Sequence, residues 1–489
     1  MAKRTKSRSS EPAEPTPDSE PSDSNPGTSQ TIRTNGPQFG EPTPTPDPNK
    51  FSVKHGSDSQ AYKILDSQRG TLQPRPFPIA SEAEPRITLA DALGKKGSDI
   101  ENAITRAGQI VFHSVGDTGN TKGPHDMELV ADKMVSDYNE TDPRAVPSFL
   151  YHLGDVVYSF GEAEYYYDQF YDPFRNYPAP IFAVPGNHDG MVAPNTSADS
   201  LAAFLENFCA SGQPPHRTPE SGGLARTAQV QPGVYFTLEA PFVRILGLYS
   251  NCLEDPGVIS DQDGTYPSLT GAQLTYLQTA LQRIKKEKFN GAVIIAVHHP
   301  PYVAQTRSPK LIAGRHGGSP LMLQDIDTAC ENTGVWPHAV LSGHAHNYQR
   351  FTRTLDNQQT PFVVAGNGGH ALQRLTSKAM PTLRTPMPQA SLSNGDDQIV
   401  FENYDDAEFG YLRIIANQQQ LRIEYHPASD GEAAKTPDDS VTVDLATRKI
   451  VAYNVPQSSA VNEREHRERS ERKHRREALA PKAFGAGRF

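Results

Sequence analysis

The hydrophobic positions in the central part of the chain follow two alternating periods. Six short apolar runs have the length of buried strands, and they lie at residues 109–115, 148–153, 181–184, 291–297, 339–341 and 361–365. Four longer segments repeat apolar residues at helical spacing, and they lie at residues 126–138, 197–209, 269–286 and 321–332. Thr270 is a candidate N-cap for the third helix. Strands that alternate with helices in this way predict an α/β fold.

In two further segments the hydrophobic residues are spaced as in paired strands, without an intervening helix. Residues 233–250 have the pattern of two strands broken at Ala240-Pro241, and residues 411–425 have the pattern of a closing hairpin around Asn417-Gln418. The first of these segments falls in the long interval between the third and fourth predicted strands. A strand, a crossover helix and another strand do not fill that interval, so we expect a second sheet.

Five of the predicted strands end in a short polar segment. In chain order these segments are Gly116-Asp117-Thr118-Gly119, Gly154-Asp155-Val156-Val157-Tyr158, Gly186-Asn187-His188-Asp189, Val297-His298-His299-Pro300 and Gly343-His344-Ala345-His346. Ligands bind at the carboxyl ends of strands in α/β sheets, so we expect these segments to converge. Two aspartates, a tyrosine, an asparagine and several histidines form the donor set that a pair of transition metals needs.

Each polar segment, taken singly, has a simpler structural explanation. Gly-Asp after a strand is a common turn, and His-His-Pro-Pro is also compatible with a rigid loop that contains two hydrogen-bonded histidines. Five such segments in one order, all at strand ends, are not plausibly independent. Together they predict a two-metal site.

The order of the segments resembles that of the calcineurin-like metallophosphoesterases, and most closely the purple acid phosphatase branch. Most of that superfamily begins with Asp-x-His, whereas residue 119 of this chain is glycine, so one histidine of the first metal site is missing. Tyr158, three residues after Asp155, stands where purple acid phosphatases place a tyrosinate ligand to iron(III). Gly366-Asn367-Gly368-Gly369 and Phe409-Gly410-Tyr411 also resemble that family.

The resemblance implies an α/β/β/α sandwich of two mixed sheets flanked by helices. It covers the predicted central domain, residues 86–455, and does not extend to either end of the chain. The fibronectin-like domain that precedes the catalytic domain in plant members has no evident counterpart in the sequence.

The resemblance also implies a ligand set for two metal ions. An iron(III)-type ion would be held by Asp117, Asp155, Tyr158 and His346, and a divalent iron, zinc or manganese ion by Asp155, Asn187, His298 and His344. Asp155 would bridge the two ions. His298 is the expected ligand in its histidine pair, because the family pattern places a proline two residues after the ligand. His299, His370 and His113 are expected to be structural.

The reaction implied by the resemblance is hydrolysis of a small phosphate monoester through in-line attack by a metal-bound hydroxide. An iron(III) and a divalent ion carry about +5, and two aspartates and a tyrosinate lower this to about +2, which leaves a local cationic centre. His188 is expected to act as general acid on the departing oxygen, and Asp189 to orient it. His316, in the sequence Arg315-His316-Gly317-Gly318, is expected to contact the substrate phosphate.

Two other functions remain open at this point. A phosphodiesterase, or an enzyme that acts on nucleotides or pyrophosphate, would use the same metal centre. A noncatalytic interaction protein, whose function resides in the ends of the chain, belongs to a different class. The presence of a suitable residue at every expected ligand position argues against this second alternative.

Composition restricts partners and location. The net charge of −10 argues against nonspecific nucleic-acid binding, and the sequence contains no apolar run of membrane-spanning length. Three widely spaced cysteines provide neither a disulfide framework nor a zinc site. The basic residues at the start are followed by Ser, Glu and Pro rather than by an apolar core, unlike a secretory signal. We therefore expect a cytoplasmic protein with no nucleic-acid or membrane partner.

Both ends of the chain are strongly biased in composition. Residues 1–85 begin with a stretch of fifty residues that holds ten prolines and one aromatic residue, so we predict a disordered segment. Residues 456–489 form a charged tail in which Glu-to-Arg pairs at four-residue spacing favour a solvated helix. Nucleic-acid binding by this tail is the alternative, but its five interleaved glutamates weaken the attraction for a phosphate backbone.

Overall fold

The computed structural model describes most of the central part of the chain. The described residues are 73–454, except 79, 81, 122, 193–196, 198, 212–217, 219–226, 305–315, 376–382, 393–396 and 429–435. Contacts divide the chain into residues 1–34 and residues 35–489, and every described residue belongs to the second unit. The predicted disordered segment up to residue 72 and the predicted charged tail lie outside the described residues.

The described residues form two mixed sheets. The nine-stranded sheet has the order β1-β5-β6-β7-β8-β10-β9-β12-β11, and the seven-stranded sheet has the order β16-β15-β14-β13-β2-β3-β4. The strands are β1 Arg86–Thr88, β2 Ile110–Val115, β3 Leu150–His152, β4 Ile181–Ala183, β5 Phe236–Ala240, β6 Val243–Leu248, β7 Ala292–Val297, β8 Ala339–Ser342, β9 Tyr348–Leu355, β10 Gln358–Ala365, β11 Met387–Gln389, β12 Gln398–Asp405, β13 Gly410–Ala416, β14 Gln420–Pro427, β15 Asp439–Asp444 and β16 Lys449–Ile450.

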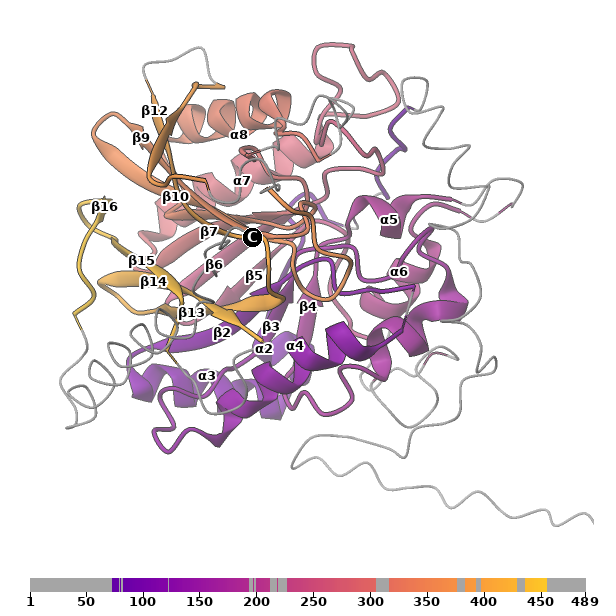
Figure 1. Ribbon diagram of the computed structural model, residues 1–489. Coiled ribbons are helices and arrows are strands. Elements are labelled where there is room, and N and C mark those ends of the chain that lie inside the picture. The colour runs from indigo at the N-terminus through magenta and orange to yellow at the C-terminus, as the bar shows by residue number, and fades with distance from the viewer. Residues whose placement is uncertain are drawn as a thin grey trace, which may run out of the picture. The chain divides into compact units, whose positions relative to one another are not determined.

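Helices cover the outer faces of the two sheets (Figure 1). The α-helices are α2 Leu89–Leu93, α3 Lys95–Ala107, α4 His125–Ser136, α5 Asn187–Gly190, α6 Ala202–Phe208, α7 Ala272–Glu287 and α8 Pro320–Thr333, with short 3-10 or π segments η3 Asp137–Asn139, η4 Ala163–Tyr165 and η5 Tyr167–Tyr171. Helices α7 and α8 pack together and α7 contacts β6, whereas α3 contacts β2 and α4 contacts β13. The expected α/β/β/α sandwich is therefore confirmed.

Strand β7 shows why the predicted strands are continuous apolar runs: its two faces pack against different hydrophobic cores. Ala292, Ile294 and Ala296 belong to the core between the two sheets, and the intervening residues Val293, Ile295 and Val297 belong to the core beneath the helices. Successive side chains of a strand point to opposite faces, so a strand covered on both sides must be apolar throughout. All six residues of β7 are buried.

The predicted strands are all present, but two helix starts differ from the prediction. The helix expected at 197–209 begins only at Ala202, because Leu201 has a left-handed φ of 64° that a helix cannot include. The helix expected from 269 begins at Ala272 with Gly271 as its N-cap, so the prediction of Thr270 as N-cap is wrong. The break predicted at Ala240-Pro241 lies instead at Pro241-Phe242, where Phe242 has a φ of 68°.

Ordered chain precedes the expected start of the domain at residue 86. The backbone amide of Arg75 donates to the side-chain oxygen of Asn251, 2.8 Å away, and the Asn251 amide donates in turn to the Arg75 carbonyl. Glu84 accepts a hydrogen bond from Arg283 of α7 at 2.6 Å. The predicted disordered segment therefore extends too far, because its last residues pack on the sandwich. The sequence pattern also gave no indication of β1, α2 or α3.

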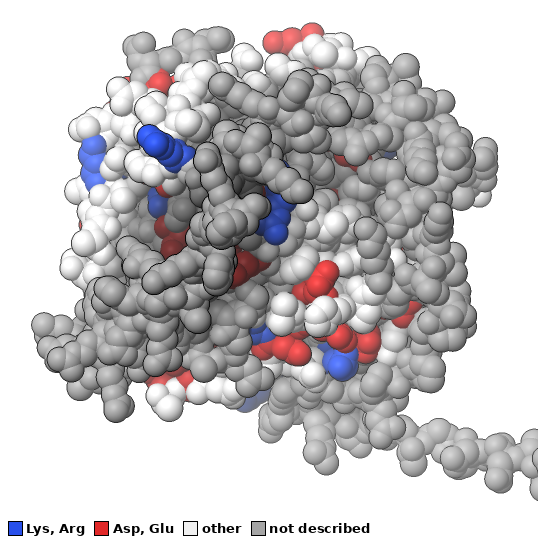
Figure 2. All heavy atoms as spheres, in the orientation of Figure 1, with Lys and Arg blue, Asp and Glu red and all other residues white. Residues whose placement is uncertain are grey.

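One face of the molecule carries few basic side chains among the described residues. In Figure 2 the described Lys and Arg side chains on that face are scattered, some beside acidic residues and others among uncharged ones. Within the described part of the chain, every helix is too short or too polar to cross a bilayer.

Candidate metal centre

The five polar segments lie at the carboxyl ends of strands from both sheets. β2, β3 and β4 are parallel neighbours in one sheet, and β7 and β8 are parallel neighbours in the other. The two sets of loops meet directly: the backbone amide of His344 donates to the Asp117 carboxylate at 2.8 Å. Glycine permits this approach, since a Cβ on Gly343 would lie 2.5 Å from Asp117 Oδ2. The tertiary fold thus brings together segments that are far apart in the sequence.

Three candidate ligands have an unusual backbone conformation. Asp117, Asp155 and His344 have φ values of 56°, 55° and 68°, in the left-handed region that non-glycine residues seldom adopt. Such residues persist only where their surroundings fix them, and they cluster at functional sites. The conformation turns each side chain away from the line of its strand and towards the other sheet's loops.

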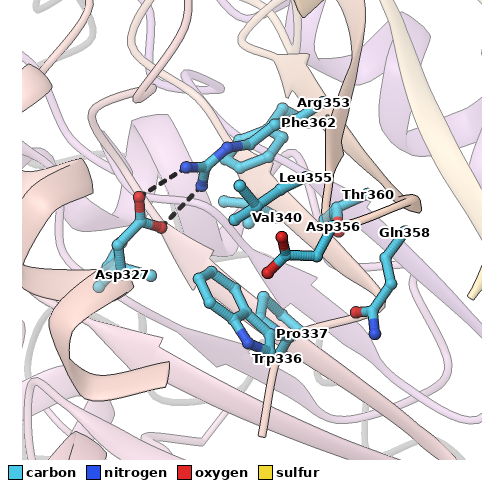
Figure 3. A pocket seen from close by; sticks show the side chains of 11 residues that line it. Asp327, Trp336, Pro337, Val340, Arg353, Leu355, Asp356, Gln358, Thr360 and Phe362 are labelled. Carbon is cyan, nitrogen blue, oxygen red and sulfur yellow. Dashed lines mark hydrogen bonds and ion pairs between the residues drawn. The ribbon is translucent and has the colours of Figure 1, made fainter. Parts of the chain in front are cut away.

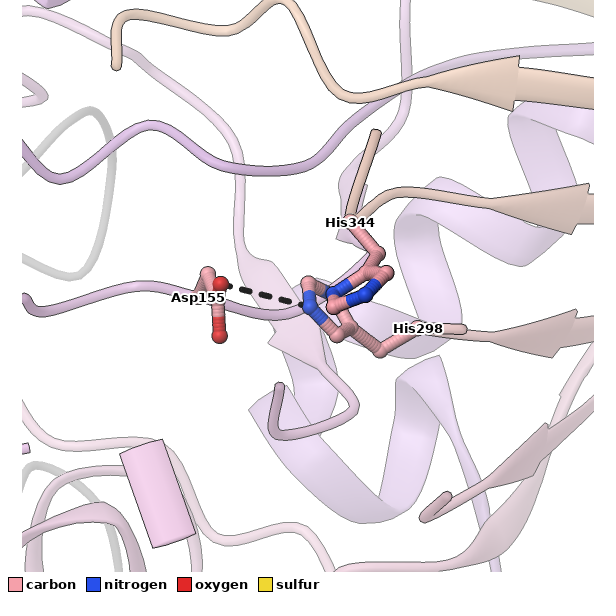
Figure 4. A group of neighbouring side chains, drawn as sticks. All are labelled: Asp155, His298 and His344. Atoms are coloured by element: carbon pink, nitrogen blue, oxygen red, sulfur yellow. Dashed lines mark ion pairs between the residues drawn. The ribbon is translucent and has the colours of Figure 1, made fainter. Parts of the chain in front are cut away.

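Asn187, His298 and His344 form one compact group of candidate ligands, here called the second ligand group. The side-chain oxygen of Asn187 lies 3.0 Å from His298 Nε2 and 3.0 Å from His344 Nδ1. Figure 4 shows the imidazoles of His298 and His344 next to each other, with Asp155 facing them from the other side. Ligand atoms of Asp155 and the two histidines all lie within 4.8 Å of one another.

Asp117, Tyr158 and His346 form another compact group, here called the first ligand group. The Tyr158 hydroxyl donates to Asp117 Oδ1 at 3.1 Å and lies 3.2 Å from His346 Nε2. His346 Nε2 is 3.5 Å from the same Asp117 oxygen. All three side chains are nearly inaccessible to solvent.

Asp155 contacts both ligand groups. Its Oδ2 lies 3.3 Å from His298 Nε2 in the second group, and burial together with the charges of Asp117 and Asp155 raises the pKa of Tyr158 in the first group. The other Asp155 oxygen accepts a hydrogen bond from the His188 backbone amide at 2.9 Å, which fixes the plane of the carboxylate. This position between the groups is the one that a bridging carboxylate requires.

The spacing within the two groups fits metal coordination. Oxygen and nitrogen ligands about 2.1 Å from one cation lie about 3.0 to 3.4 Å apart in octahedral or tetrahedral geometry. The separations of 3.0 and 3.3 Å in the second group, and of 3.1 to 3.5 Å in the first, fall close to this range. In addition, the buried His344 Nε2, an atom that can bind a metal, has no hydrogen-bond partner among the described residues. The side chains therefore fit two neighbouring cations.

The electrostatics of the site also favour cations. Burial, together with the charge of Asp155, raises the pKa of Asp117 well above its ordinary value, and burial raises the pKa of Tyr158. Although burial opposes it, the carboxylates of Asp155 and Asp117 raise the pKa of His298 to about 9. In the described part of the chain, neither aspartate forms an ion pair with Lys or Arg. Bound cations would supply the missing positive charge.

His344 and His346 are in the protonation state that metals need. Burial, reinforced by neighbouring imidazoles, lowers the pKa of both histidines well below the ordinary value. A neutral imidazole has a free lone pair and is the form that binds metals. In two of the candidate ligands, His346 and His298, the ring nitrogen that faces away from the site contacts a backbone carbonyl, which fixes the orientation of the ring. His346 Nδ1 lies 3.0 Å from the Ala371 carbonyl, and His298 Nδ1 lies 2.8 Å from the Leu153 carbonyl.

His188 lies beside the first ligand group, but Asp189 does not orient it as expected. The ring of His188 packs on Tyr158 with centroids 4.4 Å apart, and its Nδ1 lies 2.8 Å from the Ser159 carbonyl oxygen. The Asp189 carboxylate instead accepts hydrogen bonds from the backbone amides of Gly186, Val156 and Val157. The prediction for Asp189 is corrected: this side chain joins the two ligand-bearing loops, and a carbonyl holds the His188 ring.

His316 lies close to both ligand groups, as the sequence suggested. Its ring centroid is 4.5 Å from that of His344 and 5.0 Å from that of His346. Arg315, which precedes it, lies outside the described residues. The described part of this loop therefore brings one further imidazole to the edge of the site.

Sequence reasoning missed two neighbours of the site. His370, expected to be structural, stacks on Tyr158 with ring centroids 3.8 Å apart and an angle of 8° between the rings. Glu254 has its carboxylate 3.9 Å from His188 Nε2, and both side chains are more than nine-tenths buried. The glycine-rich segment before His370 was a usable signal, whereas nothing in the sequence around Glu254 indicated its position.

His299 and His113 have contacts that suit structural roles. His299 Nε2 lies 2.9 Å from the Leu253 carbonyl and its Nδ1 lies 2.7 Å from the Ser250 hydroxyl, and burial lowers its pKa to about 3. His113 pairs with Asp137 at 2.9 Å in a buried cluster beneath β13. Neither ring presents a nitrogen to the two ligand groups.

Comparisons with known proteins agree with this arrangement. The family model of calcineurin-like phosphoesterases matches residues 111–348, which span all seven candidate ligands. A relative named "Probable inactive purple acid phosphatase 9", from Arabidopsis thaliana, is 22% identical over 304 residues, which cover 58% of this chain and 42% of the relative.

One similar solved structure is that of the purple acid phosphatase PPD1 from yellow lupin (Lupinus luteus) seeds, with a TM-score of 0.44 and 15% sequence identity. The match covers 72% of this chain and 57% of the lupin chain. GAP50, described as the anchor in the inner membrane complex of Plasmodium, has a TM-score of 0.43 and 11% identity, with 74% and 94% of the two chains covered. This chain spans about half the length of the two plant proteins. Residues 111–348 match the family model of calcineurin-like phosphoesterases, and the chain is similar to the purple acid phosphatases.

Proposed function

We propose that this chain is a dinuclear-metal phosphatase that hydrolyses small phosphate monoesters. Asp117, Tyr158 and His346 would hold an iron(III) ion, the second ligand group would hold a divalent iron, zinc or manganese ion, and Asp155 would bridge them. When bound, the two cations would neutralise the phosphate and activate the attacking water. The observation that carries the proposal is the convergence of two ligand groups on one carboxylate, at distances typical of metal ligands.

Histidines that are not ligands would bind and orient the substrate. Because a carbonyl can only accept, His188 Nδ1 donates to Ser159, and in the imidazolium form Nε2 would donate its proton to the leaving oxygen as general acid. His316, next to His344 and His346, would contact the phosphate from the opposite side. Buried Asp189 would hold the loops that carry Asp155 and Asn187 in register.

The experiment that tests the proposal is metal analysis combined with a panel of phosphate esters. We expect about two metal ions per chain and turnover of p-nitrophenyl phosphate. Asn187→Ala should lower the metal content, whereas His188→Ala should lower turnover by roughly 10²-fold or more with both metals retained. A metal-loaded, folded protein without activity on any ester would contradict the proposal. That outcome would match the label "inactive" in the name of the Arabidopsis relative.

Iron is tested separately from catalysis. Tyrosinate bound to iron(III) produces a visible charge-transfer band, which should disappear in Tyr158→Phe. A colourless, fully active enzyme that contains manganese or zinc would remove iron from the proposal but leave the phosphatase. Faster hydrolysis of bis-p-nitrophenyl phosphate, or of a nucleotide or pyrophosphate, would assign the same centre to the alternative substrate classes.

A further inference from the structure

The loop after β6 is held rigidly at both ends. Its first residue, Tyr249, exchanges two hydrogen bonds with the Gln273 side chain of α7, at 2.6 and 2.9 Å. At the far end, Val258 donates to the Ser250 carbonyl at 3.0 Å, so the loop closes on itself. Residues 249–258, here called the β6 loop, are therefore fixed to the scaffold on which the metal centre is built.

The histidine next to a candidate ligand fixes the middle of the β6 loop. The carbonyl of Leu253 accepts a hydrogen bond from His299 Nε2 at 2.9 Å. The Gly257 amide donates to the Ser319 hydroxyl at 2.9 Å, at the start of α8. The three residues between these anchors, Glu254, Asp255 and Pro256, consequently have little freedom. A rigid support of this kind is what precise placement of a functional side chain requires.

Glu254 faces His188 Nε2, the ring nitrogen opposite the one that contacts the Ser159 carbonyl. Its carboxylate oxygen lies 3.9 Å from His188 Nε2, with side chains that are 7% and 6% exposed. This distance is too long for a direct hydrogen bond, but catalytic contacts are often long until a substrate is bound. The Ser159 carbonyl and the Glu254 carboxylate thus lie at opposite nitrogens of the ring.

Asp255 supports the other histidine that is not a ligand. Its Oδ1 accepts a hydrogen bond from the Gly317 backbone amide at 2.7 Å, directly after His316. His316 has a left-handed φ of 56°, a conformation that needs support from its surroundings. The Asp255 carboxylate supplies such a support, because it holds the peptide that follows the strained residue.

We propose that the β6 loop positions both substrate histidines: Glu254 orients His188 towards the leaving oxygen, and Asp255 holds His316 against the phosphate. The inference rests on the phosphatase function proposed above and adds two positioning residues to it. Because the two carboxylates act through different histidines, their loss should affect different kinetic parameters. Loss of Glu254 should change the response to the leaving group, whereas loss of Asp255 should weaken phosphate binding.

The test for Glu254 compares a poor leaving group with a good one. Glu254→Gln should lower kcat for phenyl phosphate roughly tenfold, and for dinitrophenyl phosphate by less than about twofold, since a good leaving group needs little help from an acid. Glu254→Asp keeps the charge with a shorter reach and should give an intermediate value. Metal content should stay that of the wild type in each variant.

Glu162→Gln is the matched control for Glu254. Glu162 is a partly buried carboxylate near enough to His188 for their charges to interact, and it accepts a hydrogen bond from the Phe160 backbone amide at 3.0 Å, which glutamine can also accept. We expect its leaving-group dependence to equal that of the wild type. Three outcomes would overturn the assignment of Glu254. In Glu254→Gln, kcat could fall equally for both substrates or not fall at all. In Glu162→Gln, kcat could fall selectively for the poor leaving group, as expected for Glu254→Gln.

The test for Asp255 uses inorganic phosphate as the probe. Asp255→Ala should raise KM, and the dissociation constant of inorganic phosphate, about tenfold or less, with kcat nearly unchanged. Asp255→Asn keeps an acceptor oxygen and should bind phosphate like the wild type. Unchanged phosphate binding in Asp255→Ala would overturn this assignment. Calorimetric titration with phosphate requires no turnover, so it separates failure of this inference from failure of the proposed function.

Discussion

Two clusters of buried charged and polar groups lie at opposite ends of β8, and they differ in how their charge is balanced. The candidate metal centre follows the strand at His344, and a cluster around Arg353 lies next to Trp336 and Pro337, which precede the strand. In the latter, called the Arg353 cluster, Arg353 donates two hydrogen bonds of 2.7 Å to Asp327 and one of 2.7 Å to Asp397. Figure 3 shows the parallel pairing of Arg353 with Asp327 beside a small cavity of about 50 Å³.

The comparison shows why only one of the two clusters calls for a metal. In the Arg353 cluster the guanidinium provides donors that match the carboxylates, with its side chain 5% exposed, so the charges are paired within the chain. At the metal centre the carboxylates face imidazoles and a phenol, and burial shifts the pKa values of several of them strongly. Burial alone therefore does not mark a metal site. Buried carboxylates that meet several imidazoles, and that form no ion pair with Lys or Arg among the described residues, distinguish the metal centre.

Metal removal should produce the largest difference between the two clusters, because only the metal centre is expected to depend on bound cations. Dialysis against a chelator should lower phosphatase activity at least about 10³-fold, because the cations provide several kcal/mol of transition-state stabilisation. It should also lower the melting temperature, since ions that bind only the folded state stabilise it by mass action. Activity and melting temperature should return when metal is added. Full activity in protein shown to be metal-free by elemental analysis would contradict the comparison.

Arg353→Met should break the other cluster without affecting metal binding. The substitution leaves Asp327 and Asp397 without their cation, and breaking a buried ion pair from one side costs about 3 to 5 kcal/mol of the free energy of unfolding. Denaturant titration measures this loss, and metal content per folded chain should not change. Adding Asp327→Asn and Asp397→Asn should restore part of the stability. A loss below about 1 kcal/mol in Arg353→Met would mean that solvent screens the cluster.

A third cluster of buried charges lies around Glu424 on β14. Like the Arg353 cluster, it is balanced by side chains of the protein, and the pH dependence of stability tests this balance. Although burial opposes it, hydrogen bonding from His426 and the charges of Arg413 and Arg422 lower the pKa of Glu424 from 4.5 to about 2. A carboxyl whose pKa is lowered by folding contributes stability above its unfolded pKa, and this contribution is lost as the pH falls through the folded pKa. The two pKa values correspond to on the order of 3 kcal/mol.

Glu424→Gln should therefore flatten the decline in the free energy of unfolding between about pH 4.5 and pH 2. Denaturant titrations at a series of pH values compare the variant with the wild type. Asp142→Asn is a suitable control, because the Asp142 side chain is 42% exposed and pairs with Arg144 at the surface. An equal slope in Glu424→Gln and the wild type would show that this carboxyl is not stabilised by its partners.

Tyr302→Phe should have the smallest effect. The buried Tyr302 hydroxyl donates to Asp397 at 3.3 Å, and loss of one hydrogen bond to a charged group that keeps its main partner costs about 1 kcal/mol. Thermal denaturation measures the change. Metal content and activity should equal those of the wild type, and a decrease in either would show that the two ends of β8 are coupled.

The sequence was most informative where a pattern repeats within a few residues. The apolar runs around β2, β3, β4, β7 and β8 predicted strands that are all present, because a strand buried on both faces needs consecutive apolar residues. The polar residues that end these runs predicted where the ligands converge, because parallel strands place their carboxyl ends at one edge of a sheet. Thr270 shows the limit of such reasoning, since a helix start depends on one backbone conformation and not on a repeat.

Contacts between distant loops could not be predicted in the same way. Asp189 is adjacent to His188 in the sequence, yet its carboxylate binds amides of another loop, while Glu254, far away in the sequence, approaches the ring. His370 was expected to be structural and stacks on Tyr158. Side-chain partners of this kind depend on which loops the fold brings within a few ångströms, and no local periodicity records them.

By itself, the sequence determined the order of the strands and helices that carry the candidate ligands and the chemical nature of those seven residues. Both follow from local rules, namely hydrophobic periodicity and the donor atoms that side chains carry. The tertiary structure alone decided which of these donors meet around Asp155, which carboxylates lack a Lys or Arg partner among the described residues, and that the β6 loop faces His188 and His316. These properties depend on distances across the two sheets, which a linear sequence does not contain.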